Sequence, residues 1–310
     1  MEIKPSPYLL SACVSIPTYN REEVLVQTLK SVLSLDPFPL EVLVIDQTEE
    51  HEATTKEFLA KIERAGQIRL IRQQPPSLTA ARNRAIAETR CEVIIFIDDD
   101  VELPTDFVAR HMKNYSNDKT AAVAGRVEQE SQPRYPHPPP GGKWSPLFDY
   151  KYFSVFSSQR VEGVASFMGC NHSVRTDILR QLGGYDTHYI GSAFREDTDM
   201  AVRIWKSGGQ IVFDPEARLR HLAAPSGGCR INLSRKANPE WWVPFNRHYF
   251  AFRHLFPKWE FWKLIFFRDF RETVLRKANL LRPWRIPRAV FSYGYAVVRA
   301  WEESRRKSKE

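Results

Sequence analysis

The residues whose types and spacing most clearly suggest chemistry are three consecutive aspartates, Asp98, Asp99 and Asp100, which directly follow the apolar run VIIFI at 93–97. A run that is apolar on both faces predicts a strand in the middle of a sheet. In open α/β sheets, ligands bind at the carboxyl ends of such strands. Three carboxylates gathered there need a shared cation, and oxygen ligands suit Mg²⁺ or Mn²⁺, which usually keep substrate phosphates as further ligands. The alternative is a solvated acidic turn, since Asp is common where strands end.

A second acidic group, Arg195-Glu196-Asp197-Thr198-Asp199, opens a predicted helix that runs to about Lys206. Carboxylates in the first turn of a helix lie by its positive end, which favours their ionised form. Asp197 is therefore a candidate for accepting a proton from a hydroxyl group. The alternative is an ordinary acid near the helix N-terminus.

The elements that must position these acids alternate between strand and helix patterns. Apolar runs predict strands at 13–16, 40–46, 68–71, 93–97 and 121–127. Helical spacing predicts helices that begin near Asn20, which with Glu23 forms a capping box, and at about 52–64 and 78–88. This order indicates parallel β-α-β units with helices on both faces of one sheet. The predicted fold class is α/β, a doubly wound and mostly parallel sheet.

No glycine-rich phosphate-binding loop accompanies the predicted sheet. The pattern GxGxxG does not follow the first strand, and GxxxxGK[ST] occurs nowhere. A divalent ion held by carboxylates would then be the group that neutralises a diphosphate.

Length and composition place the chain among ordinary globular proteins. The 310 residues suit one large domain, or one domain with an appendage. The four cysteines have no ligand-like spacing, so neither a zinc site nor a disulfide framework is indicated, and a reducing compartment fits best: Cys13, Cys91, Cys170 and Cys229. No signal pattern opens the chain and no apolar stretch approaches the roughly 20 residues of a membrane span, so a cytoplasmic location is expected.

Five short strings, in this order and spacing, resemble the family 2 glycosyltransferases. They are PTYN at 17–20, VLVID ending at Asp46, ARN at 81–83, IDDD at 97–100, and GCN through GGYD to REDTD across 169–199. The resemblance covers roughly residues 11–224. It implies the GT-A fold, a UDP-, GDP- or dTDP-linked sugar as donor, Mg²⁺ or Mn²⁺ as cofactor, and transfer with inversion to a hydroxyl of a glycan or lipid-linked acceptor.

The resemblance assigns the donor side to residues at the ends of the first strands. Pro17, Thr18, Tyr19 and Asn20 would contact the nucleotide, with Thr18 and Tyr19 lining the nucleobase pocket and Asp46 accepting a hydrogen bond from the base. Arg82 would lie near the nucleotide. Tyr19 could instead cover the first helix, and Arg82 could pair with Glu88 or Asp46.

The resemblance likewise assigns the metal and the acceptor side. Asp98 and Asp100 would be the carboxylates of the DxD motif, one toward the ribose or sugar and one on the metal, although Asp99 could take either role; we expect Asp98 and Asp99 on the substrate and Asp100 on the metal. His221 would add a third metal or diphosphate contact, with a packed or surface histidine as the alternative. Asp197 would be the catalytic base, and Glu196 would help to position hydroxyls.

Two departures from the family pattern leave the choice of nucleobase open. Gln47, Thr48 and Glu49 follow Asp46 where many members have Asp-Gly-Ser, and Ser77 stands where a glycine often precedes the ARN helix.

The formal charge of +8 is unevenly distributed and predicts two domains. Residues 230–310 carry 19 Lys/Arg against 7 Asp/Glu, a net +12, and 18 of the 38 aromatic residues. We expect a glycosyltransferase domain at 1–229, with a nucleotide half at about 11–127 and an acceptor half at about 128–229 that opens with a proline-rich loop, and a basic, aromatic helical extension at 230–310. Such a tail could lie on an anionic membrane surface, pack over the domain or, least favoured, bind nucleic acid. The first places the protein peripherally on the inner face of the cell membrane.

Two other functions are compatible with the patterns. A sugar-phosphate nucleotidyltransferase shares the sheet, the acids and the metal, but it usually has a glycine-rich loop after its first strand. A catalytically dead scaffold that binds membrane or nucleic acid would lack metal-dependent nucleotide binding.

Overall fold

The computed structural model describes residues 10–129, 160–228 and 241–307. The chain divides into two compact units. The sheet unit comprises Met1–Asp186 and Glu196–Gly228, and the helical unit comprises Thr187–Arg195 and Cys229–Glu310. Most of the proline-rich loop assigned to the acceptor side, residues 130–159, lies outside the described residues, as do 229–240.

The sheet unit is built on one mixed sheet in the order β3-β2-β1-β4-β8-β6-β9-β5, with β7 (Val161–Glu162) paired to β9. The first half is parallel, as predicted: β1 (Ala12–Thr18), β2 (Glu41–Asp46), β3 (Arg69–Arg72) and β4 (Val93–Ile97). In the second half, β8 (Asn171–Arg175) runs antiparallel between β4 and β6 (Thr120–Glu128), and β9 (Gln210–His221) is parallel to β6 and antiparallel to β5 (Val101–Glu102). The sheet is thus mostly parallel where the nucleotide half was expected.

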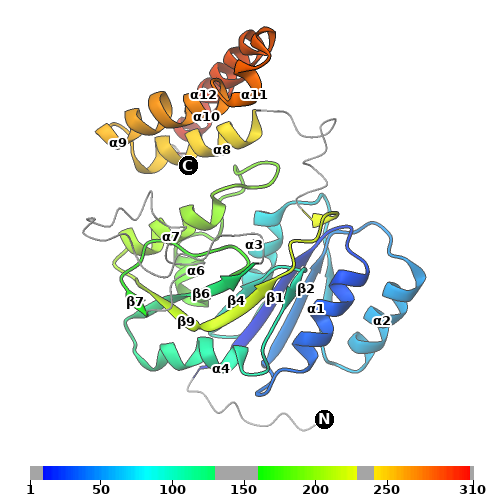
Figure 1. The fold of residues 1–310 in the computed structure, drawn as a ribbon. Coiled ribbons are helices and arrows are strands. Elements are labelled where there is room, and N and C mark those ends of the chain that lie inside the picture. Colours follow the sequence, from blue (N-terminus) through cyan, green and yellow to red (C-terminus); the bar gives the residue numbers. More distant parts are fainter. Residues whose placement is uncertain (1–9, 130–159, 229–240, 308–310) are drawn as a thin grey trace. The chain divides into compact units, whose positions relative to one another are not determined.

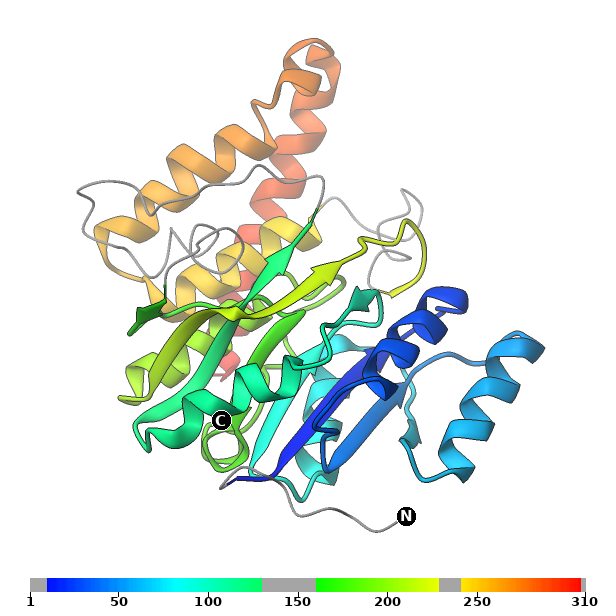
Figure 2. The same cartoon turned by 60° about the horizontal axis from the view of Figure 1, so that its bottom comes forward.

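Helices cover both faces of this sheet (Figures 1 and 2). One apolar cluster joins Val14 and Ile16 of β1 to α1 (Glu23–Leu33), α2 (Ala53–Arg64) and α4 (Phe107–Met112), which continues into η1 (Lys113–Ser116). The other joins Cys13 of β1 to α3 (Leu78–Glu88), α6 (Thr176–Gln181) and α7 (Glu196–Lys206). Alternate residues of a strand point to opposite faces, so β1 contributes to both clusters and lies in the middle of the core.

Two local predictions at the end of β1 are wrong. The strand was expected to stop before Pro17, but it continues to Thr18. Beyond Ser15 it pairs only with β2, so the N–H that Pro17 lacks is not needed for the β4 ladder. Asn20 does not cap α1: it has φ 51, the helix begins at Glu23, and no side chain caps it. Asn tolerates this left-handed conformation, and the chain turns there instead.

The helical unit contains α8 (Trp242–His254), α9 (Trp259–Trp262), the π-helical η3 (Lys263–Asp269), α10 (Phe270–Thr273), α11 (Lys277–Leu280), η4 (Pro283–Arg285) and α12 (Ile286–Lys307). α8 and α12 pack against each other. The unit also includes the segment 187–195, which interrupts the sheet unit in sequence: Asn246 of α8 accepts a hydrogen bond from the N–H of Ile190 at 3.1 Å and donates one to its C=O at 2.8 Å. Within the described residues, no helix is both long and apolar enough to cross a bilayer.

Candidate active site

The three aspartates lie where β4 ends, beside the carboxyl end of β1. Thr18, the last residue of β1, donates a hydrogen bond to Oδ2 of Asp99 at 2.7 Å. Asp99 and Asp100 are buried, whereas Asp98 is half-buried. Burial, together with the two neighbouring aspartates, raises the pKa of Asp99 to about 7, although Arg21 and Thr18 oppose the shift. Burial and the charge of Asp100 also raise the pKa of Asp98. The raised pKa values show that the ionised forms of Asp98 and Asp99 are destabilised in this site. This agrees with the expectation from the sequence that three adjacent carboxylates need a shared cation.

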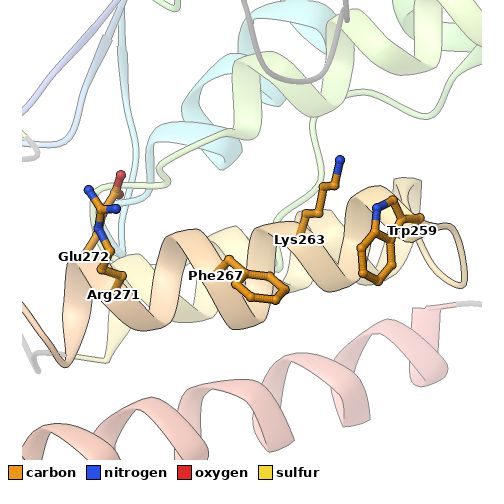
Figure 3. Close-up of a pocket in the computed structure, with 5 residues that line it drawn as sticks. All are labelled: Trp259, Lys263, Phe267, Arg271 and Glu272. Carbon is orange, nitrogen blue, oxygen red and sulfur yellow. The ribbon is translucent and has the colours of Figure 1, made fainter.

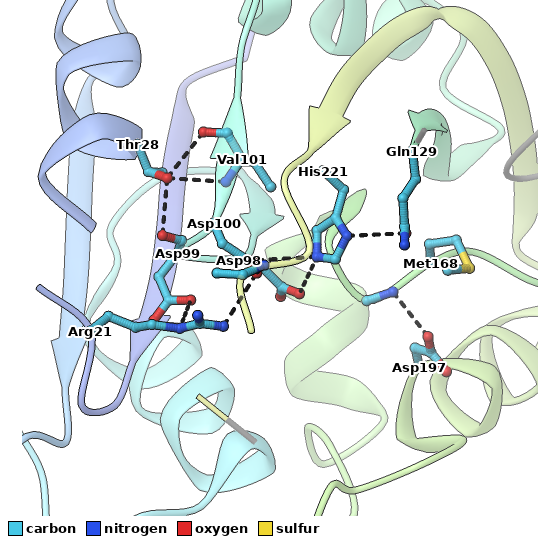
Figure 4. A network of polar contacts seen from close by, with 12 residues as sticks. Arg21, Thr28, Asp98, Asp99, Asp100, Val101, Gln129, Met168, Asp197 and His221 are labelled. Carbon is cyan, nitrogen blue, oxygen red and sulfur yellow. Dashed lines mark hydrogen bonds and ion pairs between the residues drawn. The ribbon is translucent and has the colours of Figure 1, made fainter. Parts of the chain in front are cut away.

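Arg21 lies in this site, and the sequence analysis missed it. Its Nε lies 3.4 Å from Oδ1 of Asp99 and its Nη2 lies 3.2 Å from Oδ2 of Asp100, and the side chain is 5% exposed. The guanidinium also donates to the C=O of Ser226. The only local signal was a cation directly after PTYN. Arg21 partly offsets the charge of Asp99 and Asp100 (Figure 4), and through Ser226 it also connects the segment after β9 to the β4 tip.

His221 ends β9 and faces the same acids. Its Nε2 lies 3.1 Å from Oδ1 of Asp100 and 3.9 Å from Oδ2 of Asp98. Its Nδ1 lies 3.2 Å from Oε1 of Gln129. Both ring nitrogens of His221 thus face side-chain oxygens, and Nε2 is the nitrogen that lies among the aspartates.

The donor set at this point fits a divalent cation. One ligand atom each from Asp98, Cys170 and His221 lie within 4.8 Å of one another. Cys170 was not expected here, because the spacing of the cysteines gave no metal pattern; the fold brings it in from the start of β8. The predicted metal ligand Asp100 lies against His221, and its other oxygen accepts from Arg21 and from the N–H of Ala224 at 2.9 Å. Four candidate ligands thus lie at the β4 tip.

The second acidic pair, Glu196 and Asp197, opens α7. Oδ2 of Asp197 accepts from the N–H of Gly169 at 2.9 Å, and Oδ1 accepts from the N–H of Thr198 at 2.6 Å. Asp197 remains half-buried, whereas Glu196 is buried. Oε2 of Glu196 has no hydrogen-bond partner within the described residues. A buried, unpartnered oxygen is costly, and a substrate hydroxyl is the kind of group that would satisfy it.

Arg82 of α3 is 1% exposed and pairs with Glu196. Its Nη2 also donates to the C=O of Gly169 at 2.9 Å, and its guanidinium lies 5.1 Å from the ring centre of Tyr185. Burial raises the pKa of Glu196 to about 8; Arg82 opposes this shift, and Asp197 and Asp98 add to it. Arg82 was expected near the nucleotide, with an ion pair to Glu88 or Asp46 as the alternative; of these, the structure replaces the alternative, since the ion-pair partner of Arg82 is Glu196.

The segment Met168-Gly169-Cys170 lies between the two groups of acids. Cys170 approaches Asp98, while Gly169 binds both Asp197 and Arg82. A Cβ on Gly169 would lie 2.8 Å from Nη2 of Arg82 and 3.3 Å from Oε1 of Glu196. The structure therefore brings the acids of the β4 tip and those at the start of α7 next to the same three-residue segment.

Asp46, the last residue of β2, is fully buried, and both of its carboxylate oxygens contact other protein groups. Its Oδ2 lies 2.9 Å from Nε2 of His51 and 2.7 Å from Nη1 of Arg72, and its Oδ1 accepts from the N–H of Thr48 at 2.9 Å. Burial favours the protonated acid, but these hydrogen bonds and charges outweigh it and lower the pKa of Asp46. A nucleobase that binds here would meet a carboxylate whose two oxygens both have protein partners.

The other residues assigned to the nucleotide lie around this strand end. Pro17 is buried, Tyr19 is half-buried and Asn20 is exposed. The two departures from the family pattern bond to each other: Oε1 of Gln47 accepts from the N–H of Ser77 at 2.6 Å, and Ser77 caps α3. These residues thus fix the loop before α3.

Similar solved structures define the class of fold. A mannosyltransferase, PcManGT from Pyrobaculum calidifontis, solved with GDP-Man and Mn²⁺, superimposes with a TM-score of 0.54 at 20% identity, over 94% of this chain and 76% of that one. GalNAc-T7, solved with UDP, GalNAc and Mn²⁺, gives a TM-score of 0.56 at 18% identity, over 80% of this chain and 51% of that one. The sheet unit therefore has the GT-A fold of these enzymes, as predicted.

The sequence comparisons identify the family. The family model for glycosyl transferase family 2 matches residues 13–183, more than half of the chain. The chain belongs to this family, which confirms the predicted resemblance and the predicted enzyme class, a glycosyltransferase.

Two curated relatives are about equally similar. A glucosyl-dolichyl phosphate glucuronosyltransferase of Haloferax volcanii is 25% identical over 68% of this chain and 69% of its own length. The succinoglycan biosynthesis protein ExoM of Rhizobium meliloti is 26% identical over 66% of this chain and 64% of its own length. The match thus spans about two thirds of these relatives.

Proposed function

We propose that this protein transfers a sugar from a nucleotide-diphosphate donor, with inversion and with the help of a divalent ion, to a hydroxyl of a glycan or lipid-linked acceptor. The observation that carries the proposal is the segment 168–170, which adjoins the acids of the β4 tip through Cys170 and Asp197 through Gly169. An inverting displacement needs a leaving-group site and a base on opposite sides of the reacting carbon, and these two groups supply them. The family membership and the ligands named for the similar structures, GDP-Man or UDP with Mn²⁺, support the same reaction.

The residues present fit the implied Mg²⁺ or Mn²⁺. Asp98, Asp100 and His221 would hold it, with Cys170 within reach, because their ligand atoms converge and their clustered charges call for a cation. When bound, the ion neutralises the diphosphate as it leaves. Asp99 is held by Thr18 and Arg21. It therefore orients the donor or keeps the neighbouring aspartates in place, and does not bind the ion.

The acceptor side is served by the start of α7. Asp197 takes the proton of the attacking hydroxyl while the new bond to the sugar carbon forms and the bond to the diphosphate oxygen breaks. The N–H of Gly169 and of Thr198 fix the Asp197 carboxylate. Oε2 of Glu196, which Arg82 leaves unoccupied, accepts a hydrogen bond from a sugar or acceptor hydroxyl. The proposal of a lipid-linked acceptor is supported by the Haloferax relative, whose name specifies a dolichyl phosphate sugar. The proposal of a glycan acceptor is supported by the succinoglycan biosynthesis protein.

The experiment is a screen of nucleotide sugars, with Mn²⁺ or Mg²⁺, for release of the nucleoside diphosphate, followed by Asp197→Asn on the donor that responds. Losing a general base costs on the order of 10²-fold or more, so we expect transfer to fall by at least that factor while calorimetry shows nucleotide binding unchanged.

The matched control is Asp177→Asn. Asp177 also lies in the first turn of a helix and also accepts from the next backbone N–H, but it is exposed on α6. Unchanged turnover in Asp197→Asn would remove the base assignment. A wild-type protein that releases no diphosphate from any donor and binds no nucleotide with metal would favour a scaffold without activity.

A further inference from the structure

The helical unit exposes most of the large apolar side chains on the surface of the described residues. Of 16 such side chains, 13 belong to this unit. Three of them are the most exposed of all, Leu281 at 71%, Trp284 at 73% and Phe291 at 76%. Scattered apolar residues on a surface are ordinary, but a concentration of this kind marks a surface that contacts another phase or partner.

The exposed residues are densest between α11 and α12. Six consecutive residues, Leu280 to Arg285, are all exposed, and their sequence LLRPWR contains three large apolar side chains and two arginines. The chain enters α12 directly afterwards, and Pro287 and Arg288 are exposed as well. The apolar residues and the arginines of this stretch are therefore exposed together; the leucines are not buried on one side with only the arginines facing solvent.

α12 continues the pattern along one side. Its inner face is narrow and made mainly of small residues, Ala296, Ala300 and Ser304 with Tyr293, and packs within the unit, where α8 is its main neighbour. Phe291 and Val298 are seven residues apart, so they lie on one face of the helix, roughly opposite Tyr293. Both are exposed, Val298 at 54%. The helix thus has an apolar outer face that no described residue covers.

Charge distinguishes between possible occupants of this surface. The segment 230–310 carries a net +12, and Arg282 and Arg285 stand among the exposed apolar side chains. A second copy of the chain would bring like charges together, whereas an anionic bilayer complements them. Each Lys or Arg near such a surface adds attraction, and Trp and Phe favour the headgroup boundary.

The same combination recurs on another element of the unit. A hollow of about 570 Å³ is lined by Trp259, Lys263, Phe267, Arg271 and Glu272 along α9, η3 and α10 (Figure 3). Lys263 Nζ lies 5.8 Å from the ring centre of Trp259. Aromatic rings with adjacent cations are therefore a property of the unit and not only of α12.

We propose that the surface from Leu280 to Val298 docks on an anionic lipid bilayer, with α12 lying in the headgroup region. The apolar outer face enters the boundary between headgroups and acyl chains, and Arg282 and Arg285 bind lipid phosphates. This inference names a partner for the helical unit and does not depend on the transfer reaction. It gives the protein a means to stay where a lipid-linked or membrane-assembled acceptor would be.

The test is flotation of the full-length protein with vesicles, without donor or metal. We expect the protein to float with phosphatidylcholine vesicles that contain phosphatidylglycerol, to float much less with phosphatidylcholine alone, and to be released by salt. Leu281→Ser/Trp284→Ser/Phe291→Ser should lower the bound fraction on the order of tenfold or more. Arg282→Glu/Arg285→Glu should remove the preference for the anionic vesicles.

The matched control removes three comparably exposed apolar side chains from the sheet unit, Phe38→Ser/Leu40→Ser/Trp205→Ser, at 44%, 51% and 47% exposure. It should float like wild type. Because all the altered side chains are exposed, circular dichroism should show every variant folded. Unchanged flotation of the helical-unit triple variant would overturn the proposal. So would equal binding to neutral vesicles, or a dimer in sedimentation that this variant dissociates, since that would assign the surface to a second copy.

Discussion

Gly169 is the residue on which the geometry of the site most depends. It donates its N–H to Asp197, accepts from Arg82 through its C=O, and leaves room for the contact between Arg82 and Glu196. A side chain at this position has no free space, because Arg82 is itself buried against Tyr185. One backbone position thus sets the relative placement of three charged side chains.

We predict that Gly169→Ala lowers transfer by roughly 10²-fold, because the added Cβ would displace Arg82 or Glu196 by about an ångström. The fold should survive, with a loss of about 1–3 kcal/mol in the free energy of unfolding, as is usual for overpacking. Steady-state kinetics and chemical denaturation measure the two effects. Gly294→Ala is the control, since a Cβ there meets nothing within 4 Å; its activity and stability should not fall. Wild-type rates in Gly169→Ala would show that the segment does not position the acids.

Cys170 gives the cation site a ligand that can be observed directly. A thiolate prefers soft cations, whereas the carboxylates and imidazole beside it also accept Mn²⁺. We predict that Cd²⁺ produces an ultraviolet thiolate-to-metal absorption band, that Cys170→Ser abolishes it, and that excess Mn²⁺ displaces it. Cys13→Ser/Cys91→Ser is the control: both thiols are buried in the core, away from the segment 168–170, and the band should persist. A band that survives in Cys170→Ser would exclude the cysteine from the site.

Local sequence patterns could place some of these residues and not others. The aspartate triplet directly follows a predicted strand, and Glu196-Asp197 opens a predicted helix. The positions of both groups could therefore be predicted from the sequence. Arg21 and Cys170 could not be found in this way, because their contacts with the acids exist only after β1, β4 and β8 have come together. The roles given to the individual site residues remain predictions for the experiments above.

At the scale of elements, the parallel half of the sheet was predictable and the insertion of β8 was not. β1 to β4 are apolar runs separated by helices, which is the pattern of β-α-β units. β8 is buried but reads NHSVR: Asn171 bonds to the C=O of Arg126 and Ala217, and His111 lies 3.0 Å from Ser173 and Asn171. The first three residues of this strand are polar, and their hydrogen bonds to other parts of the fold compensate for their burial. The sequence therefore lacks the apolar run that would predict a buried strand, and the antiparallel position of β8 next to β4 could not be inferred.

The end of β2 has a titratable cluster that predicts a pH dependence. The hydrogen bond to Asp46 raises the pKa of His51 above 6.5, and Glu22 adds to the shift. The folded protein therefore holds this proton more tightly than the unfolded chain does. The resulting stabilisation is complete below the unfolded pKa and is lost as the pH rises through the folded pKa. Asp46, whose pKa is lowered from 3.8, stays ionised through this range.

We predict that His51→Gln lowers the free energy of unfolding by about 1–3 kcal/mol near pH 5.5, and by clearly less near pH 9. Urea denaturation at both pH values measures the difference. Arg72→Gln is the control, because it removes another partner of Asp46 whose charge does not titrate in this window; its cost should be the same at both values. A His51→Gln cost that does not change with pH would show that the imidazole is not protonated in the folded protein.

At the scale of the whole molecule, the charge and aromatic content of the tail predicted a separate helical extension, and the chain divides at Gly228 and Cys229. The composition could not predict that the helical unit also takes in residues 187–195. These residues carry no helical or strand signature, and their partners lie more than 50 residues away: Ile190 binds Asn246, and His188 lies 3.3 Å from Glu303. Contacts of such separation leave no trace in local periodicity.

The residue that follows this segment is Glu196, so the helical unit holds the chain immediately before the acidic pair of α7. Asn246 is fully buried and makes the two hydrogen bonds to Ile190, one as acceptor and one as donor. We predict that Asn246→Ala speeds hydrogen exchange across 187–195 by at least tenfold, because the N–H and C=O of Ile190 lose their partner. We also expect this variant to lower the turnover number more than the nucleotide affinity. Asn279→Ala is the matched control: Asn279 is equally buried in the helical unit but binds the C=O of Thr273 and Val274. If both variants, or neither, loosen 187–195, then Asn246 does not hold this segment and the helical unit has no specific hold on the residues before Glu196.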